Sequence, residues 1–417
     1  MKILLIAVGT RGDVEPFLAI AEMLTKKGEE VICCFPGQFK GITEENGFRF
    51  SGLTSKYLET LESDEGVIAM GGKANFFQKI RAYYFLYKRA GKINKIMSKQ
   101  QKELIKKEEP DKVIYHVKAS YPLIYETLFP NKTVLVSPIP YVIHPVKDHA
   151  HIGFKNMGEF LNKLTYRLAN YGLLKNNQAA TKGLYDKKEV SSKKILSALK
   201  NGKMVYSVSP NLFNPVNNWG ENVKVFGYHE RNKTLNWSPD ENLVSFIKQN
   251  QNIVFITFGS MVNAEPKVKA EFIIRVLEKL KIPAIINSGY GGLAKPDDFH
   301  SDSIYFVSSI PYDWLLQQID YMIHHGGSGT THMAIKNGCA SAIIPHIVDQ
   351  FMWNKINFNK GFGPKGVSIN RLNESNFETL LTDLISNPDY LEKVKLAANK
   401  MNQEDFESEL CSFLLSK

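Results

Sequence analysis

The stretch HHGGSGTTH, from His324 to His332, decides the fold, because a buried strand is predicted to run into a glycine-rich turn that opens a helix. Such a turn lets the main chain approach an anion closely, and the first amides of the helix, with its partial positive charge, favour a phosphate. His325 can reach the same anion as a neutral donor or as a cation. The stretch therefore predicts a diphosphate site, whose further members are Gly326, Gly327, Gly329, Thr330 and Thr331.

Short apolar runs alternate with longer mixed segments along the whole chain. Near-continuous Val and Ile runs between helical segments are typical of parallel strands covered on both faces. A chain of 417 residues also exceeds what one hydrophobic core usually organises. We therefore expect two doubly wound α/β domains, with strands at 2–8, 30–35, 112–117, 133–137, 204–209, 252–260, 283–289, 304–309, 321–325 and 341–346.

The sequence predicts an N-terminal domain at 1–215, a linker at 216–238 and a C-terminal domain at 239–400. The boundary falls in a stretch, 209–241, that is rich in Pro, Asn and Gly and has little periodicity. A second irregular region, 137–158, carries three prolines, three histidines and several aromatic residues. Loops of this size in a compact domain are usually functional or disordered.

Composition narrows the class of protein. Apolar residues make up 43% of the chain and charged residues 23%, which is ordinary for a folded protein and excludes a disordered chain. Four cysteines have no metal-ligand spacing, so neither a disulfide framework nor a zinc site is expected. The start of the chain has too few apolar residues for a signal peptide, and no run approaches the roughly 18 that a spanning helix needs. We expect a cytoplasmic protein.

The chain carries a formal net charge of +10 and a sequence pI near 9.1. A lysine-rich solvated surface is the interpretation we favour, and nucleic acid is not an expected partner because the basic clusters lack an interleaved aromatic motif. The segment 76–107 mixes aromatic and basic residues at roughly helical spacing. This pattern is typical of an interfacial membrane helix or of a helix packed on its own domain. We favour the packed helix and leave peripheral membrane contact open.

Polar residues follow two further predicted strands. Asp349 and Gln350 come just after a strand end, where open parallel sheets bind ligands. A carboxylate and an amide side by side can hydrogen-bond to neighbouring sugar hydroxyls. Ser260, in the sequence TFGS, lies in another turn after a strand and is a candidate phosphate donor.

With these residues the chain resembles the inverting, nucleotide-sugar-dependent glycosyltransferases that have two Rossmann-like domains, the GT-B architecture. Within them it is similar to the sterol, macrolide, glycopeptide and carotenoid branch. The resemblance covers nearly the whole chain and implies that a final helix, in 401–417, packs back on the N-terminal domain. It is carried by VGTRGDVEPFLAIAEML near the start and by FGS, IPYDWLL, HHGGSGTT, GCASAIIPHIVDQFMWN and GFGP.

The resemblance assigns His325 to the β-phosphate of the donor, and Ser260 to the same group from a neighbouring loop. It assigns nucleobase binding to the segment at Ser309. The plant branch has a tryptophan at this position, so the contacts with the base differ here. The resemblance also assigns diphosphate contacts to Gly327, Ser328, Gly329 and Thr330. It adds Ile310 and Pro311 to the nucleobase segment and assigns the sugar hydroxyls to Asp349 and Gln350.

Transfer of a sugar to an alcohol also needs a base that takes the hydroxyl proton. The resemblance places it in the first loop, at Asp13, whose ordinary pKa would have to be raised by partial desolvation in a cleft between the domains. Asp13 is also a candidate N-terminal helix cap, and both roles can hold. The runners-up are three histidines of the irregular loop: His144, His149 and His151.

Other titratable residues receive less specific roles. Arg11 is expected near the diphosphate, beside Asp13, or in solvent. His116, His229 and His300 have no recognisable partners and are taken as non-functional, and His324 as structural. The acceptor is assigned to aromatic and basic positions of the first domain and to one tryptophan of the second: Arg11, Phe85, Tyr141, His144 and Trp353.

The sequence therefore predicts transfer of a hexose, with glucose expected, from a UDP-sugar to a hydroxyl of a lipophilic small molecule. No cofactor or metal is required, because the helix terminus and His325 stabilise the leaving diphosphate. The chain is expected as a monomer or homodimer. Three alternatives stay open: a dTDP-deoxysugar-dependent enzyme of natural-product synthesis, a UDP-sugar epimerase, and a non-catalytic lipid-binding protein on this scaffold.

Overall fold

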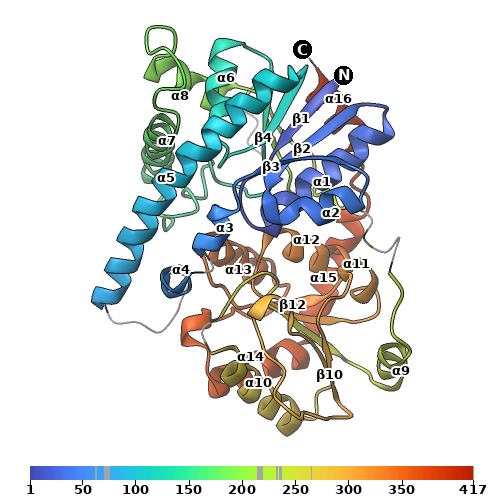
Figure 1. The fold of residues 1–417 in the computed structure, drawn as a ribbon. Coiled ribbons are helices and arrows are strands. Elements are labelled where there is room, and N and C mark those ends of the chain that lie inside the picture. The colour runs from blue at the N-terminus through green and yellow to red at the C-terminus, as the bar shows by residue number, and fades with distance from the viewer. Residues whose placement is uncertain are drawn as a thin grey trace. The chain divides into compact units, whose positions relative to one another are not determined.

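A computed structural model of the chain describes residues 1–61, 63–69, 76–213, 219–231, 233, 237–263 and 265–416. The chain divides into two compact units. Unit 1 comprises 1–65, 83–231 and 405–417, and unit 2 comprises 66–82 and 232–404. Each unit is built on its own sheet (Figure 1).

Unit 1 contains a seven-stranded sheet in the order β3-β2-β1-β4-β5-β6-β7, with all neighbouring strands parallel. Its strands are β1 (Lys2–Ile6), β2 (Glu30–Pro36), β3 (Arg49–Leu53), β4 (Lys112–His116), β5 (Thr133–Ser137), β6 (Met204–Tyr206) and β7 (Val223–Val225). The helices of the N-terminal part are α1 (Arg11–Lys26), α2 (Lys40–Glu45), α3 (Lys56–Leu61), α4 (Asp64–Ala69), α5 (Phe76–Glu108), α6 (Tyr121–Leu128), α7 (Glu159–Ala180) and α8 (Ser192–Asn201), with a 3-10 turn at Gly37–Phe39. Most of α4 and the start of α5 fall in 66–82 and so belong to unit 2.

Unit 2 contains a five-stranded parallel sheet in the order β10-β9-β8-β11-β12. Its strands are β8 (Val254–Thr257), β9 (Ala284–Asn287), β10 (Ile304–Val307), β11 (Tyr321–His324) and β12 (Ala340–Ile343). The helices are α9 (Glu241–Gln249), α10 (Pro266–Leu280), α11 (Tyr312–Leu315), α12 (Ser328–Lys336), α13 (Val348–Lys360), α14 (Glu374–Ser386) and α15 (Pro388–Met401), with 3-10 turns at Gly289–Gly291 and Ile369–Arg371. The expectation of two doubly wound α/β domains is confirmed.

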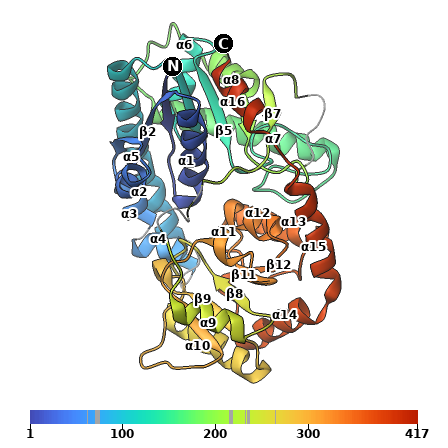
Figure 2. The same ribbon diagram turned by 90° about the vertical axis from the view of Figure 1, so that its right-hand side faces the viewer.

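Most strands are buried on both faces, as is typical of parallel sheets covered by helices. All five residues of β4 and of β5 are buried, as are all four of β8, β11 and β12. Helices on both sides of each sheet supply the covering apolar surface. In unit 1 this includes the last helix, α16 (Glu407–Leu415). It begins 396 residues after the start of α1 but packs in the same core through Leu410, Cys411 and Leu414 (Figure 2).

The linker prediction at 216–238 needs correction. Val223–Val225 forms the edge strand β7, in register with β6, and unit 1 continues to Arg231. A three-residue strand between Asn- and Gly-rich segments is too short to show a period of two, so the sequence concealed it. Residues 216–218, 232 and 234–236 of that segment lie outside the described residues. The assignment of 66–82 to unit 2 was not predicted either.

Candidate active site

The predicted phosphate site lies at the switch point of the sheet of unit 2. Strands β8 and β11 are neighbours, and the chain leads away from them towards opposite edges of the sheet. Open parallel sheets bind ligands outside the carboxyl ends of the strands at this point. Ser260 follows β8 and His325 follows β11, so the structure brings these two predicted residues to adjacent strand ends.

His325 is held between two glycines. A Cβ built on Gly259 would lie 2.7 Å from its Cε1, and one on Gly327 would lie 2.5 Å from its Nε2. Gly326 has φ +88° and faces Ile343 closely. The glycines at these positions therefore let the main chain of both loops close on the imidazole, which is 8% exposed and has a buried Nδ1 without a hydrogen-bond partner in the described part of the chain.

Burial sets the protonation of His325. Desolvation lowers its pKa to about 4, so the ring is neutral at pH 7. Of the two forms that the sequence left open, the neutral donor describes the unliganded protein. A diphosphate bound beside the ring would favour the protonated form and raise this pKa.

Helix α12 begins at the glycine turn and presents main-chain donors. Gly327 is the N-cap, and as a glycine it places no side-chain oxygen on the first amides of the helix. Thr331 N makes the first intrahelical bond, to Gly327 O at 2.9 Å. Ser328, Gly329 and Thr330 are half-buried in the first turn, where amides lack intrahelical acceptors and attract an anion.

The nucleobase segment lies at one edge of the same sheet. Ser309 is exposed, Ile310 is 6% exposed and points into the core, and Pro311 caps the short helix α11. This segment follows β10, three strand intervals from β11, which is roughly 14 Å at the usual strand spacing. Main-chain groups and the Ser309 side chain are thus what this segment can offer a base.

Asp349 and Gln350, the predicted sugar-hydroxyl pair, are not equally available to a sugar. Gln350 is 3% exposed, and its Oε1 accepts hydrogen bonds from the amides of His346 at 2.7 Å and Ile347 at 3.2 Å. Its amide oxygen is therefore engaged in starting α13. Asp349 is half-buried in the first turn and is the better placed of the two to meet a sugar.

The acceptor assignment of Trp353 is wrong. Its side chain is 0% exposed and packs edge-on against His332, with ring centroids 5.0 Å apart. His332 is itself buried and bonds through Nδ1 to Ser328 O at 2.7 Å. Trp353 lies on the core face of α13, four residues before the buried Asn357 and three after the buried Gln350.

The second predicted site lies at the switch point of unit 1. Strands β1 and β4 are neighbours in the centre of the sheet, and the chain leads from them to opposite edges. Asp13 lies in the first turn of α1, which follows β1, and His116 is the last residue of β4. Lys118 follows two residues later. The fold thus brings Asp13 close to two titratable side chains, His116 and Lys118, that lie about 100 residues further along the chain.

Asp13 is both a helix-start residue and a buried carboxylate. Its Oδ2 accepts a hydrogen bond from Thr10 N at 2.8 Å, as the third residue of a capping box does. The Lys118 ammonium donates to Oδ1 at 3.0 Å and to Oδ2 at 2.9 Å. Gly9 leaves room for this carboxylate, since a Cβ there would overlap it. Asp13 is 6% exposed.

The expected rise in the basicity of Asp13 is not found. Burial alone would raise its pKa, but the Lys118 ammonium and the hydrogen bonds from Lys118 and Thr10 outweigh burial and hold the pKa below its ordinary value. His116 would act in the same direction only as a cation. The sequence argument counted desolvation but not Lys118.

His116, which the sequence analysis set aside, faces Asp13. Its Nε2 lies 3.4 Å from Asp13 Oδ1, and its Nδ1 lies 3.1 Å from Val8 O. A carbonyl only accepts, so Nδ1 carries the proton, and no residue that the structure describes donates to the buried Nε2. Desolvation lowers the His116 pKa to about 4, so the ring is neutral at pH 7. The signal that could have found it is its place at a strand end beside β1.

Arg11 does not approach Asp13 within hydrogen-bond distance. It donates from Nε to Glu15 Oε1 at 2.9 Å, and Arg231 donates to Glu15 Oε2 at 3.0 Å. The cation beside Asp13 is Lys118, so the predicted role of Arg11 in holding Asp13 ionised belongs to Lys118.

The histidines of the irregular loop are used in packing. His144 is 6% exposed and bonds through Nδ1 to Tyr206 Oη at 3.1 Å and through Nε2 to Lys200 O at 2.9 Å, so neither ring nitrogen is available as a base. Tyr141 stacks on His149 with centroids 3.9 Å apart. Burial raises the pKa of Tyr141 to about 12. His151 packs on Phe154 and Tyr166.

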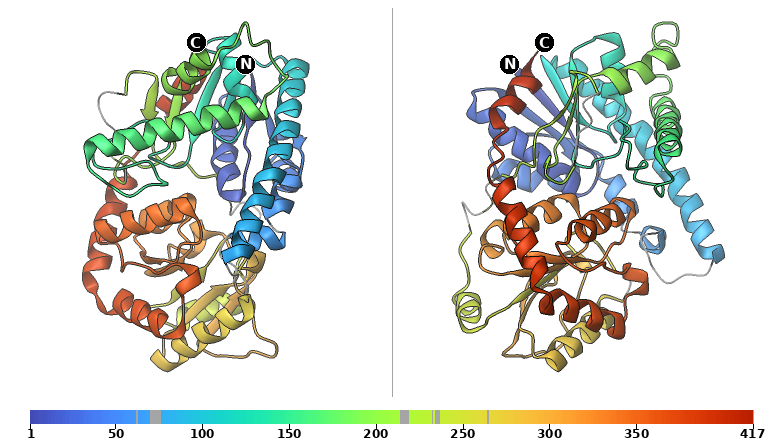
Figure 3. Two further views of the ribbon diagram at one scale, coloured as in Figure 1. Left: turned by 90° about the vertical axis from the view of Figure 1, so that its left-hand side faces the viewer. Right: turned by 180° about the vertical axis from the view of Figure 1, so that it is seen from behind.

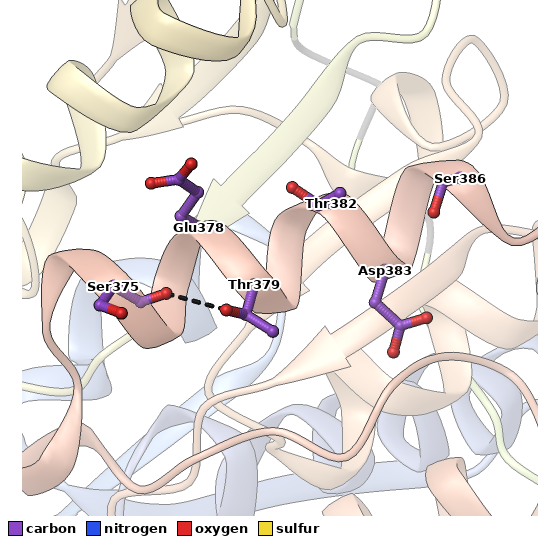
Figure 4. Close-up of a pocket in the computed structure, with 6 residues that line it drawn as sticks. All are labelled: Ser375, Glu378, Thr379, Thr382, Asp383 and Ser386. Atoms are coloured by element: carbon purple, nitrogen blue, oxygen red, sulfur yellow. Dashed lines mark hydrogen bonds between the residues drawn. The ribbon is translucent and has the colours of Figure 1, made fainter.

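Phe85 lies on α5, 36% exposed, with the Arg89 guanidinium 5.6 Å from its ring centroid. A surface hollow of unit 2 lies along α14 and is lined by short polar side chains of that single helix (Figure 4). The hollow contains none of the predicted site residues and has no converging donors from a second element. Its lining is Ser375, Glu378, Thr379, Thr382, Asp383 and Ser386.

Both units are similar in sequence to domains of known proteins. Residues 3–114 match the glycosyltransferase family 28 N-terminal domain, and residues 297–414 match the C-terminal domain of proteins like erythromycin biosynthesis protein CIII. The chain is similar in fold to the GT-B glycosyltransferases. The calicheamicin glycosyltransferase CalG4 superposes with a TM-score of 0.71 over 99% of this chain and 98% of its own, at 14% identity. The spinosyn rhamnosyltransferase SpnG, complexed with thymidine diphosphate, gives 0.63 over 100% of both chains, also at 14% identity.

Curated relatives of this GT-B chain are sterol 3-beta-glucosyltransferases. One from Arabidopsis thaliana is 26% identical over 96% of this chain, and one from Pichia angusta is 25% identical over 96%. The chain spans 62% of the length of the first and 32% of the second.

Proposed function

We propose that this protein is an inverting hexosyltransferase that transfers glucose from UDP-glucose to a hydroxyl of a lipophilic small molecule. The observation that carries the proposal is the chemistry at the two switch points: a glycine-wrapped histidine at a helix N-terminus in unit 2, and a buried carboxylate in unit 1. The histidine site can bind a diphosphate, and the carboxylate can accept a hydroxyl proton. A transferase needs both groups, whereas a nucleotide-binding protein needs only the first.

In this proposal the donor diphosphate lies on the first turn of α12. The amides of Gly329 and Thr330, the helix dipole and His325 neutralise the charge that develops as the diphosphate leaves. Ser260 contacts the same group from the loop after β8, and Asp349 contacts the sugar. The segment from Ser309 to Pro311 receives the nucleobase.

Asp13 is the proposed base. The acceptor oxygen forms a bond to the anomeric carbon while the bond from that carbon to the diphosphate oxygen breaks, and its electron pair leaves with the nucleotide. The hydroxyl proton passes to Asp13. A single displacement of this kind inverts the anomeric configuration. Because Asp13 is ionised well below pH 7, it is ready to accept the proton throughout the neutral range.

Support for the acceptor class comes from the curated relatives, which are sterol 3-beta-glucosyltransferases. The structural neighbours suggest the second candidate, since SpnG binds thymidine diphosphate. The choice between UDP and dTDP sugars rests on the base segment, where Ser309 replaces a flat aromatic side chain. A sterol and UDP-glucose are the pair we put forward.

The experiment is a donor screen followed by a product assay. Thermal shift with UDP, dTDP and their glucose conjugates ranks the nucleotides, and mass spectrometry then follows a sterol with each donor. We expect stabilisation by UDP and a sterol product heavier by one hexose. An isomerised sugar nucleotide formed without any acceptor would replace transfer by epimerisation. Absence of nucleotide binding would leave a lipid-binding protein.

A further inference from the structure

Helix α7 is built with its polar side inward. Its buried residues include Asn162, Asn170 and Asn177, and each side-chain amide donates to a main-chain carbonyl, of Lys147 at 3.0 Å, Ile143 at 3.0 Å and Ser120 at 2.7 Å. A surface helix of a soluble domain normally buries its apolar stripe. The orientation of α7 is therefore fixed by buried hydrogen bonds and leaves the apolar side outward.

The outward side of α7 is a continuous apolar stripe. Phe160 is 82% exposed, Leu168 56% and Tyr171 55%, with Leu161 and Leu164 between them. At 100° per residue these five positions fall within about 100° of one another, on the side opposite the asparagines. A stripe of this length costs solubility unless something covers it.

Helix α5 carries a second stripe of the same kind. Phe77, Ile80, Tyr84 and Tyr87 follow at intervals of three and four residues and are 51–80% exposed. The helix packs on its domain through Ile93, which is 3% exposed, and residues further along. The sequence analysis favoured a packed helix for 76–107. The structure shows this for the C-terminal part, whereas the N-terminal aromatic residues face outward.

The two helices lie on the same side of unit 1. Both run along its outside in the two views of Figure 3, α5 in light blue and α7 in green. We call the outward side of α7, together with that of α5 from Tyr84 on, the α5–α7 face; both parts belong to unit 1.

The two segments that contain these helices are strongly basic. Residues 76–102 contain eight Lys and Arg and no Asp or Glu, and residues 151–182 contain five and one. Their net charges, +8 and +4, together exceed the +10 of the whole chain. Lys88 lies 4.7 Å from the Tyr84 ring centroid and Lys175 lies 5.1 Å from that of Tyr171, so the cations border the apolar stripes.

We propose that the α5–α7 face docks on the surface of an anionic lipid bilayer. Aromatic and leucine side chains enter the boundary between headgroups and acyl chains, and the surrounding Lys and Arg side chains meet lipid phosphates. A second copy of this face is disfavoured as the partner, because an isologous contact would bring two strongly basic surfaces together. The docking does not depend on the proposed transfer reaction.

Vesicle flotation tests the proposal with the full chain. Vesicles of phosphatidylcholine are compared with vesicles in which about one-third of the lipid is phosphatidylglycerol. We expect binding to the anionic vesicles that is about ten-fold stronger and falls as salt is raised. The double variants Phe160→Ser with Leu168→Ser, and Lys88→Glu with Arg89→Glu, should each weaken binding about ten-fold or more.

The matched control is Leu396→Ser, which removes a 56% exposed leucine from α15 of unit 2 and should bind vesicles as the parent does. UDP binding, measured on every variant, separates loss of docking from loss of fold or of the donor site. Equal vesicle binding by the parent and both double variants overturns the proposal. So does a parent that ignores vesicles and self-associates through the same residues, as light scattering after size-exclusion chromatography would reveal.

Discussion

The ammonium of Lys118 donates to both carboxylate oxygens of Asp13, at 3.0 Å and 2.9 Å. Thr10 N occupies Oδ2 as well. A carboxylate oxygen has more than one lone pair, so an alcohol can donate its hydroxyl to Asp13 Oδ1 beside the Lys118 ammonium. Lys118 is 41% exposed and can move without disturbing the core.

Replacing Lys118 by Met should move the pH dependence of the reaction. Lys118 holds the Asp13 pKa below its ordinary value, so its removal lets burial raise that pKa. The acid limb of kcat/KM reports the free-enzyme base and should shift upward by about one to two pH units. Arg11→Met is the control, because Arg11 pairs with Glu15 and its loss should leave the limb in place.

His116→Gln should shift the acid limb of kcat/KM to lower pH. A neutral imidazole whose Nδ1 is bonded to Val8 O offers its Nε2 to the protonated form of Asp13, 3.4 Å away, and so favours proton uptake. Without this acceptor the limb should fall to lower pH and kcat should drop. Thermal melting shows whether the buried substitution is folded. An upward shift would mean that His116 acts as a cation, contrary to its lowered pKa.

Gly327→Ala tests how His325 is held. The backbone at Gly327, φ −62°, accepts any residue, so the only obstacle to a Cβ is the His325 ring 2.5 Å away. Gly327→Ala and His325→Ala should each weaken UDP binding by about ten-fold, as loss of a charge-assisted hydrogen bond does. In the His325→Ala background, Gly327→Ala should cost almost nothing more. Additive losses, measured by calorimetry, would show that the two residues act separately.

The sequence predicted the parts of the fold that depend on local pattern. Parallel strands with apolar residues on both faces were visible as Val and Ile runs, and the glycine turn after His325 was visible because such turns need residues without a Cβ. The strand β7 was not, since three residues in an Asn-rich segment carry too little pattern.

The site at Asp13 shows where sequence reasoning ends. Asp13 itself lay in a recognisable segment, but its partners His116 and Lys118 come from a strand end about 100 residues away that only the pairing of β1 with β4 brings near. The sign of the Asp13 pKa shift depends on that pairing. For the same reason Gln350 and Trp353 were assigned to ligands, although the main chain of His346 and the ring of His332 already occupy them.

The most direct test of the central proposal is the turnover of Asp13→Asn beside its affinity for UDP. Asparagine can still accept from Thr10 N and start α1, while it cannot take a proton. We predict that kcat falls by about 10²–10⁴-fold with UDP affinity unchanged, whereas the neighbouring Glu15→Gln keeps its turnover. Turnover of Asp13→Asn within a few-fold of the parent would contradict the account and assign the base elsewhere.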